Sequence, residues 1–251
     1  MILTPFGTDI WLADGPTVTA ALGFAYPTRM AVIRLAGGGL FVWSPVALTE
    51  EVRAAVDGLG PVRHIVAPNS LHDTFLPEWQ AAYPQALIHA APGLRMLRAD
   101  LRFGSDLGAA PHPDWAGQID QVVVCGNRIT TEVVFFHRAS GTAIFTDLLQ
   151  HLPPGWFAGW RALLARADAM TGPEPAVPRK FRVAFTDKAV ARRAMGRVLA
   201  WPVRQVVMAH GAPVPQDGAA LLKRAFRWLG AWGQDPSRSP GRPRDRTPRR
   251  W

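Results

Sequence analysis

Cysteine is nearly absent from this sequence, because Cys125 is the only one among 251 residues. One cysteine cannot form a disulfide within the chain, which excludes the small secreted folds that disulfides hold together. Cys125 closes the apolar run that starts at Val122, so we interpret it as a small buried side chain rather than a reactive thiol.

Long apolar segments are missing as well. The first residues, Met1 to Phe6, lack the basic residues and the following apolar stretch of a secretory signal peptide. No segment approaches the roughly 20 apolar residues that span a bilayer. We therefore expect a cytoplasmic protein with no membrane association.

Acidic residues are few, since 19 aspartates and glutamates stand against 28 lysines and arginines and the net charge is +9. Six arginines and two aspartates lie in residues 233–251, so +4 belongs to this segment and +5 to residues 1–232. The segment is rich in proline and poor in apolar residues, which predicts a disordered basic tail after a domain of residues 1–232. A solvated tail explains this charge, so we do not interpret the protein as binding nucleic acid. That alternative has only the tail and Arg192, Arg193 and Arg197 to support it.

The rest of the chain alternates β-rich segments with segments of helical spacing. The predicted strands are 9–13, 30–35, 40–43, 63–67, 86–90, 121–125, 132–136, 142–146 and 204–209. The predicted helices are 49–58, 75–83, a short one from 92, 156–170, 188–199 and 218–232. Such alternation is typical of layered α/β architecture. The glycines at 37–39 have no Lys-Ser/Thr after them, so we interpret them as a hairpin turn and not as a phosphate loop.

Side chains that can bind metal follow four of the apolar strands: His72, His137, Asp147 and His210. Ligands of α/β sheets gather where strands end at their carboxyl edge, so these four residues are predicted to share one rim. Three imidazoles and one carboxylate make a complete ligand set for one zinc ion, or alternatively one iron ion.

Each of these residues also has a purely structural interpretation. A histidine at a strand end can be a satisfied polar cap, and Asp147 can cap a helix over 148–151. In that helix His151 would share a face with Asp147 and orient a ligand. His64, His89 and His112 receive no predicted role.

Several segments carry a resemblance to a known family: 67–72, 132–140, 146–149 and the pair His210-Gly211. They resemble the metallo-β-lactamase-fold superfamily, and more closely a bacterial branch labelled a domain of unknown function. His210 resembles its closing histidine, Asp147 its bridging aspartate and His137 its middle histidine. The resemblance covers about residues 5–230 and implies an α/β fold, a four-layer αββα sandwich.

The superfamily motif His-x-His-x-Asp-His is degenerate in this chain. Its four places hold Pro68, Ser70, His72 and Asp73, so both leading histidines are missing. We therefore expect one metal at most, held by His72, His137, Asp147 and His210. Asp73 is the candidate catalytic residue, as a general base, with a fifth ligand or an outer partner of the metal as alternatives.

The resemblance implies a metal-dependent hydrolase acting on a small molecule, with an ester, thioester or lactone as the guess for its substrate. Iron-dependent oxidoreductases share the fold, so hydrolysis does not follow from the fold. The alternative is a non-catalytic protein whose decayed pocket holds no metal and binds a small molecule or a partner. The substrate and the oligomeric state are not readable from the sequence.

Overall fold

The computed structural model describes residues 2–232, so the basic tail predicted at 233–251 lies outside the described residues. The strands are β1 (Thr4–Gly7), β2 (Ile10–Thr19), β3 (Ala25–Arg34), β4 (Leu40–Trp43), β5 (Val62–Ala67), β6 (Leu87–Ala90), β7 (Ser105–Asp106), β8 (Ile119–Val124), β9 (Glu132–His137), β10 (Thr142–His151) and β11 (Gln205–Gly211). The α-helices are α1 (Glu50–Asp57), α2 (Leu76–Ala82), α3 (Leu94–Leu97), α4 (Gly159–Ala167), α5 (Arg179–Ala184), α6 (Lys188–Leu199) and α7 (Gly218–Ala225). Short 3-10 helices are η1 (Ala21–Gly23), η2 (Pro113–Trp115) and η3 (Arg227–Leu229).

Two sheets form the centre of the fold. The first has seven strands in the order β1-β2-β3-β4-β5-β6-β7, and the second has four in the order β11-β10-β9-β8. In the first sheet the strands are antiparallel up to β4 and parallel from β4 to β7. In the second, β10 and β11 are parallel whereas β9 is antiparallel to both β8 and β10.

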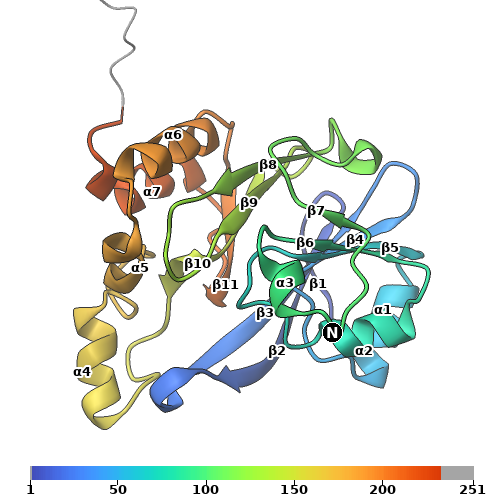
Figure 1. Ribbon diagram of the computed structural model, residues 1–251, viewed down its shortest axis with the longest axis horizontal. Coiled ribbons are helices and arrows are strands. Elements are labelled where there is room, and N and C mark those ends of the chain that lie inside the picture. The colour runs from blue at the N-terminus through green and yellow to red at the C-terminus, as the bar shows by residue number, and fades with distance from the viewer. Residues whose placement is uncertain (1, 233–251) are drawn as a thin grey trace, which may run out of the picture.

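Helices cover the outer face of each sheet (Figure 1). Apolar residues of α1, α2 and α3 pack on the first sheet, and those of α5, α6 and α7 pack on the second. A third apolar cluster, which includes Phe41, Trp43 and Phe135, fills the space between the sheets. The predicted four-layer αββα sandwich is confirmed.

This layering explains why the strands read as unbroken apolar runs. Successive side chains of a strand point to opposite faces of the sheet. In β9, Val134 and Phe136 face the helices while Val133 and Phe135 face the other sheet. Strands buried on both faces lose the polar alternation of a half-exposed sheet.

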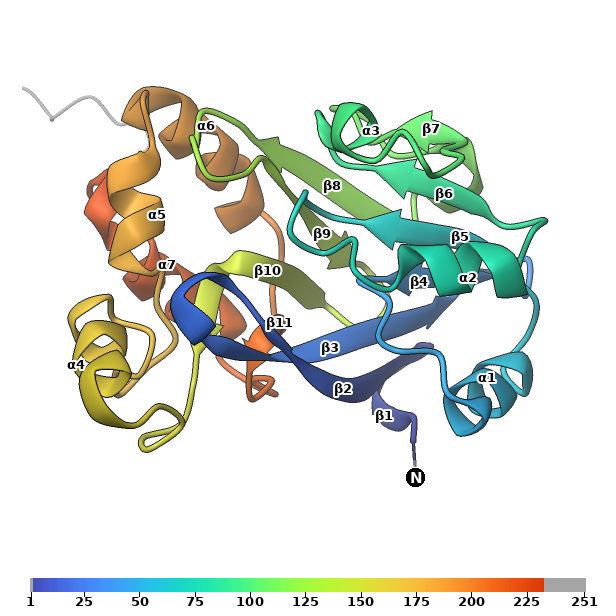
Figure 2. The ribbon, with the colours of Figure 1, turned by 60° about the horizontal axis from the view of Figure 1, so that its bottom comes forward.

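The β2–β3 hairpin extends beyond the sandwich and reaches α4 (Figure 2). Phe24 and Tyr26 of this hairpin pack with Phe157 and Met170 in a small separate apolar cluster. The hairpin and α4 thereby form one wall of the pocket described below.

Helix α1 confirms the prediction for 49–58, because Thr49 caps it and accepts a hydrogen bond from the backbone N–H of Val52. Two other predictions are wrong. Cys125 is exposed, since β8 ends one residue earlier, at Val124. Residues 148–151 continue strand β10, so Asp147 caps no helix. In the described part of the chain, no helix combines the length and the apolar composition that a bilayer crossing requires.

Candidate metal centre

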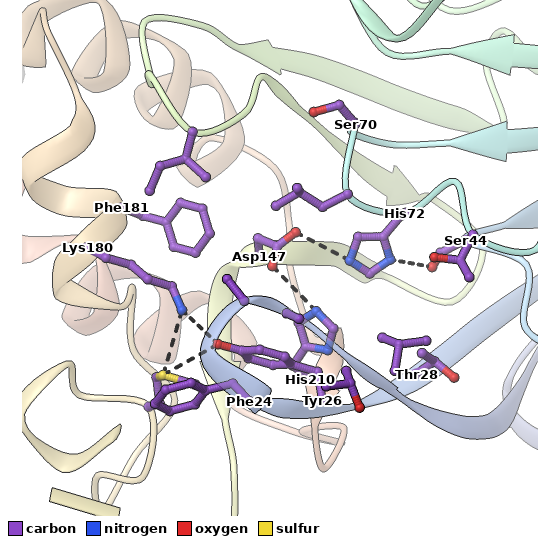
Figure 3. A pocket seen from close by; sticks show the side chains of 18 of the residues that line it. Phe24, Tyr26, Thr28, Ser44, Ser70, His72, Asp147, Lys180, Phe181 and His210 are labelled. Atoms are coloured by element: carbon purple, nitrogen blue, oxygen red, sulfur yellow. Dashed lines mark hydrogen bonds and ion pairs between the residues drawn. The ribbon is translucent and has the colours of Figure 1, made fainter. Parts of the chain in front are cut away.

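Three side chains from distant parts of the chain meet at one end of the sandwich. His72 follows β5, Asp147 lies in β10 and His210 lies in β11, and their ligand atoms are all within 4.8 Å of one another. The Asp147 carboxylate lies between the two rings, with Oδ2 3.3 Å from His72 Nε2 and Oδ1 3.4 Å from His210 Nε2 (Figure 3). The three side chains are 6–8% exposed, so little water competes for them.

A bulge in β10 projects Asp147 from the sheet. Phe145 pairs with Met208 and Gln150 with His210, so four residues of β10 lie opposite one residue of β11. The bulged backbone has no strand partner for its N–H groups. Burying such groups without acceptors would cost about 1–3 kcal/mol each, so the bulge needs another acceptor.

Glu132 supplies that acceptor from the first position of β9. Its Oε1 accepts from the N–H of Thr146, and its Oε2 accepts from the N–H groups of Asp147 and Leu148, each at 2.8–2.9 Å. The side chain is fully buried. Burial, together with the negative charge of Asp147, raises the pKa of Glu132 to about 7, while the hydrogen bonds from Thr146 and Leu148 act in the opposite direction.

Asn69 connects the bulge to the other sheet. It lies in the loop after β5 and is fully buried. Its Nδ2 donates to Thr146 Oγ1 at 2.9 Å and to Asp147 Oδ2 at 2.7 Å, and its Oδ1 accepts from the N–H of Leu71. One amide therefore holds both the carboxylate and the loop that carries His72.

Hydrogen bonds at the far side of each ring orient the two histidines. His210 Nδ1 lies 2.7 Å from the carbonyl oxygen of Pro27, and a carbonyl can only accept, so this nitrogen carries the proton. In a neutral ring, His210 Nε2 then presents a lone pair toward Asp147. His72 Nδ1 bonds to Ser44 Oγ at 2.8 Å. Ser44 has a φ of 49°, a conformation uncommon outside glycine that often marks functional sites.

The carboxylate of Asp147 is ionised although it is buried. Burial lowers the pKa of His72, although Asp147 partly offsets this effect. Burial alone would raise the pKa of Asp147, but hydrogen bonds with His210 and His72 outweigh it, and the pKa lies well below its usual value. An ionised carboxylate thus faces a neutral His72 ring and the Nε2 of His210. A ring N–H meets this carboxylate through a hydrogen bond, and a metal ion can replace the proton between nitrogen and oxygen.

The fourth predicted ligand, His137, is not part of this cluster. It ends β9, which runs antiparallel to β10, and it pairs with Thr142 at the start of β10. Five residues of strand separate Thr142 from Asp147, on the order of 15 Å. His137 bonds to Ser140 Oγ at 2.8 Å, and burial lowers its pKa to about 4 against the opposing charge of Asp9. The prediction of a common rim failed here because it treated β9 as parallel.

Asp73 borders the same pocket but offers no atom to the three-ligand group. Its Oδ2 pairs with Arg98 Nη1 at 2.9 Å, so one oxygen is already engaged. His151 does not join the cluster either, and its Nε2 lies 3.0 Å from the carbonyl oxygen of Gly172.

The three residues open into a pocket of about 880 Å³. Its walls are largely apolar and come from the β2–β3 hairpin, the loop after β5, the segment between β8 and β9, α4 and α5, with Phe24, Leu71, Phe75, Ile129, Leu164 and Phe181 among them. Lys180 is the cation in the wall, and its Nζ bonds to Tyr26 Oη at 2.9 Å (Figure 3). The pocket can therefore receive a mostly apolar small molecule and present one end of it to the three residues.

Solved structures place this architecture in the metallo-β-lactamase fold. A metallo-β-lactamase from Pontibacter korlensis is 15% identical, with a TM-score of 0.59 over 90% of this chain and 97% of that chain. A metal-soaked flavodiiron core from Synechocystis is 13% identical, with a TM-score of 0.62 over 90% of this chain and 60% of that chain. A metallo-β-lactamase from Pseudomonas aeruginosa in its mono-zinc form is 13% identical, with a TM-score of 0.56 over 89% of this chain and 93% of that chain. Identities this low show the fold alone.

The family follows from the sequence match over residues 9–176. The chain belongs to the family described as "Domain of unknown function (DUF4336)". No curated protein matches the sequence. The predicted metallo-β-lactamase fold and the predicted branch of unknown function are both confirmed.

Sequence reasoning gave no role to Asn69 and Glu132. Asn69 lies in the segment 67–72 that carried the resemblance, and Glu132 is an acidic residue at the start of an apolar strand. A charge at the edge of such a run is a usable signal, because an ionisable group is rarely fully buried without partners.

The raised pKa of Glu132 predicts a specific pH dependence of stability. Between the ordinary pKa of 4.5 and about 7 the folded protein binds more protons at this site than the unfolded chain, so stability falls as the pH rises. Glu132→Gln removes this titration. The measurement is urea unfolding of the metal-free proteins at pH 5 and at pH 8. From pH 5 to pH 8 the free energy of unfolding of the variant, relative to that of the wild type, should rise by up to about 1.4 kcal/mol per unit of pKa shift.

Glu50→Gln is the matched control, because Glu50 is an exposed residue in the first turn of α1. Its stability difference from the wild type should stay constant between the two pH values. A Glu132→Gln difference that is equally constant would contradict a raised pKa.

Proposed function

We propose that this protein is a metal-dependent hydrolase that holds a single metal ion with His72, Asp147 and His210. The observation that carries the proposal is the arrangement of three lone-pair donors around one point, with the proton of His210 committed to Pro27 on the far side of the ring. Metal-bound histidines usually donate their other ring N–H to a carbonyl or carboxylate in this way.

The spacing of the donors fits zinc. Bonds of about 2.0–2.1 Å in a tetrahedron separate two ligand atoms by about 3.3 Å. His72 Nε2 lies 3.3 Å from Asp147 Oδ2 and His210 Nε2 lies 3.4 Å from Oδ1, so each nitrogen has this separation from a different oxygen of the carboxylate, and one ligand atom from each residue lies within 4.8 Å of the others. Two imidazoles and one carboxylate also suit iron, which is the alternative. Three protein ligands leave a position open to the pocket, as catalytic sites do.

A bound ion would supply Lewis acidity and a more acidic bound water. The protein's own groups set the rest of the chemistry. Asn69 and Glu132 fix the Asp147 carboxylate, and the apolar walls limit the access of bulk water. We assign Asp73 the role of proton acceptor, since it borders the pocket and keeps one carboxylate oxygen outside its ion pair with Arg98.

The pocket walls favour a substrate with an apolar body and a carbonyl group, such as an ester, thioester or lactone. The apolar side chains can bury the body, and Lys180, which also pairs with Asp168 at 3.5 Å, can donate a hydrogen bond to a polar end. Enzyme pockets of this kind bind through apolar contact and take their orientation from a few polar groups.

Metal retention tests the proposed ligands. His210→Ala removes a ligand, so zinc content measured on the untagged protein by mass spectrometry should fall by one equivalent per chain, as it should with Asp147→Asn. His137→Gln is the control and should retain that equivalent, because His137 lies away from the cluster. Equal loss from His137→Gln and His210→Ala would contradict the three-residue site.

A matched pair of asparagines tests the contribution of Asn69 to metal affinity. Asn69 and Asn127 each accept from the N–H two residues ahead, but only Asn69 also donates to Asp147, whereas Asn127 donates to the carbonyl of Phe181. Asn69→Ala should weaken zinc affinity by about 10–100-fold, the usual effect of losing an outer partner. Asn127→Ala should leave the affinity unchanged in the same competition titration with a zinc dye. Equal losses from both variants would argue against the role given to Asn69.

The catalytic role of Asp73 can be tested directly. Asp73→Asn keeps an oxygen for Arg98 but removes the base, so kcat on a panel of aryl esters, thioesters and lactones should fall by about 10²–10⁴-fold with zinc content unchanged. Asp100 is the other carboxylate partner of Arg98, and its side chain is exposed. Asp100→Asn should therefore leave kcat near the wild-type value. If zinc-loaded wild-type protein turns over none of the panel while binding its members, the alternative of a non-catalytic binding protein is favoured.

A further inference from the structure

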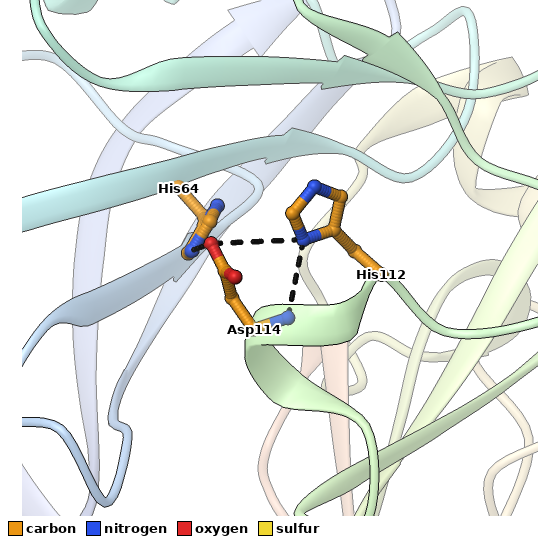
Figure 4. Close-up of side chains that lie close together, drawn as sticks. All are labelled: His64, His112 and Asp114. Atoms are coloured by element: carbon orange, nitrogen blue, oxygen red, sulfur yellow. Dashed lines mark hydrogen bonds and ion pairs between the residues drawn. The ribbon is translucent and has the colours of Figure 1, made fainter.

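A second cluster of imidazoles lies at the other end of β5, away from the proposed catalytic pocket. His64 sits near the start of β5, whereas His72 follows its end. His112 and Asp114 come from η2 and its N-cap in the segment between β7 and β8. One ligand atom from each of these three residues lies within 4.8 Å of the others (Figure 4). The sequence predicted no role for His64 or His112.

The carboxylate of Asp114 faces both rings. Its Oδ2 lies 3.2 Å from His64 Nε2 and 3.7 Å from His112 Nδ1. These separations bracket the distance of about 3.3 Å between ligand atoms of tetrahedral zinc. The donors are two imidazoles and one carboxylate, which is the same set as in the first cluster.

The protonation of His112 leaves a lone pair in the cluster. His112 Nδ1 accepts a hydrogen bond from the backbone N–H of Asp114 at 3.3 Å, so this nitrogen carries no proton. It therefore cannot donate to the Asp114 carboxylate that lies beside it. The single lone pair of this nitrogen is engaged by that N–H over a distance longer than the usual 2.7–3.2 Å, so a bound ion would replace the N–H as its partner.

A buried chain of hydrogen bonds supports His64 from behind. His64 Nδ1 lies 3.0 Å from His89 Nε2, and His89 Nδ1 lies 2.7 Å from Ser105 Oγ. His64 and His89 are 2% and 1% exposed. When protons run from His64 to His89 and on to Ser105, His64 Nε2 is free to bind metal. This is the outer support that metal-binding histidines usually have.

Packing fixes the rings in this orientation. The Trp115 ring lies 4.8–5.0 Å, between centroids, from the rings of His64, His89 and His112. Burial lowers the pKa of His89 to about 3 and also lowers the pKa of His64, so both rings are neutral near pH 7. Neutral imidazole is the form that binds metal.

We propose that His64, His112 and Asp114 form a second metal site, one that takes a divalent ion of the zinc class. The side chains of His112 and Asp114 are 27% and 55% exposed, so the site is open to solvent and its fourth position would hold water. An ion there would join β5 to the segment between β7 and β8 and hold that segment against the first sheet.

The test separates the two sites in full-length untagged protein. In a His210→Ala background, stripped protein dialysed against zinc should bind about one equivalent per chain. Adding Asp114→Asn or His112→Gln should remove that equivalent or weaken its dissociation constant at least tenfold. Adding Asp106→Asn, a nearby exposed carboxylate paired with Arg95, should change nothing. Cobalt in place of zinc should give visible absorption bands that the Asp114→Asn variant loses.

The same question can be asked without the His210 substitution, should that variant fold poorly. In the wild-type background Asp114→Asn should lower zinc content by one equivalent and leave the pocket site loaded. Zinc content and cobalt spectrum unchanged by both Asp114→Asn and His112→Gln would overturn the proposal and leave the cluster as a hydrogen-bonded relay. Loss of metal from His210→Ala, by contrast, tests the pocket site alone.

Discussion

The site depends on one hydrogen bond between the two sheets, from Asn69 Nδ2 to Asp147 Oδ2 at 2.7 Å. Asn69 belongs to the loop after β5 in the first sheet, and Asp147 belongs to the bulge of β10 in the second. The carboxylate can lie between His72 and His210 only if these two elements keep a constant separation. A buried amide that uses both its donor and its acceptor keeps that separation where apolar packing alone would tolerate sliding.

The bulge in β10 is stable only because the Glu132 carboxylate accepts hydrogen bonds from its backbone. A strand that inserts extra residues leaves backbone donors without partners, and here one carboxylate accepts three of them. The same burial raises the pKa of Glu132. Stability is therefore given up near neutral pH to keep Asp147 projecting from the sheet, an exchange that is common at functional sites.

The two imidazole clusters share one logic, although they lie at opposite ends of β5. In each, a carboxylate faces imidazole nitrogens, and at least one ring is hydrogen-bonded on its far side: the Pro27 carbonyl bonds to His210, and His89 bonds to His64. The first cluster has three donors, and the sequence has Pro68 and Ser70, not histidines, ahead of His72.

The sequence by itself determined the layers and most of the elements, because a strand that is buried on both faces requires apolar residues at successive positions. Such runs are recognisable in the sequence. It also indicated His72, Asp147 and His210, because each follows or ends a readable strand. Only the tertiary structure decided which strand ends meet. Periodicity reports burial but not strand direction, so His137 was placed at the wrong edge. The charge of Glu132 at the start of an apolar strand signals a buried acid, but the sequence does not show that a bulge of β10 is its partner, nor that Asn69 reaches the same bulge.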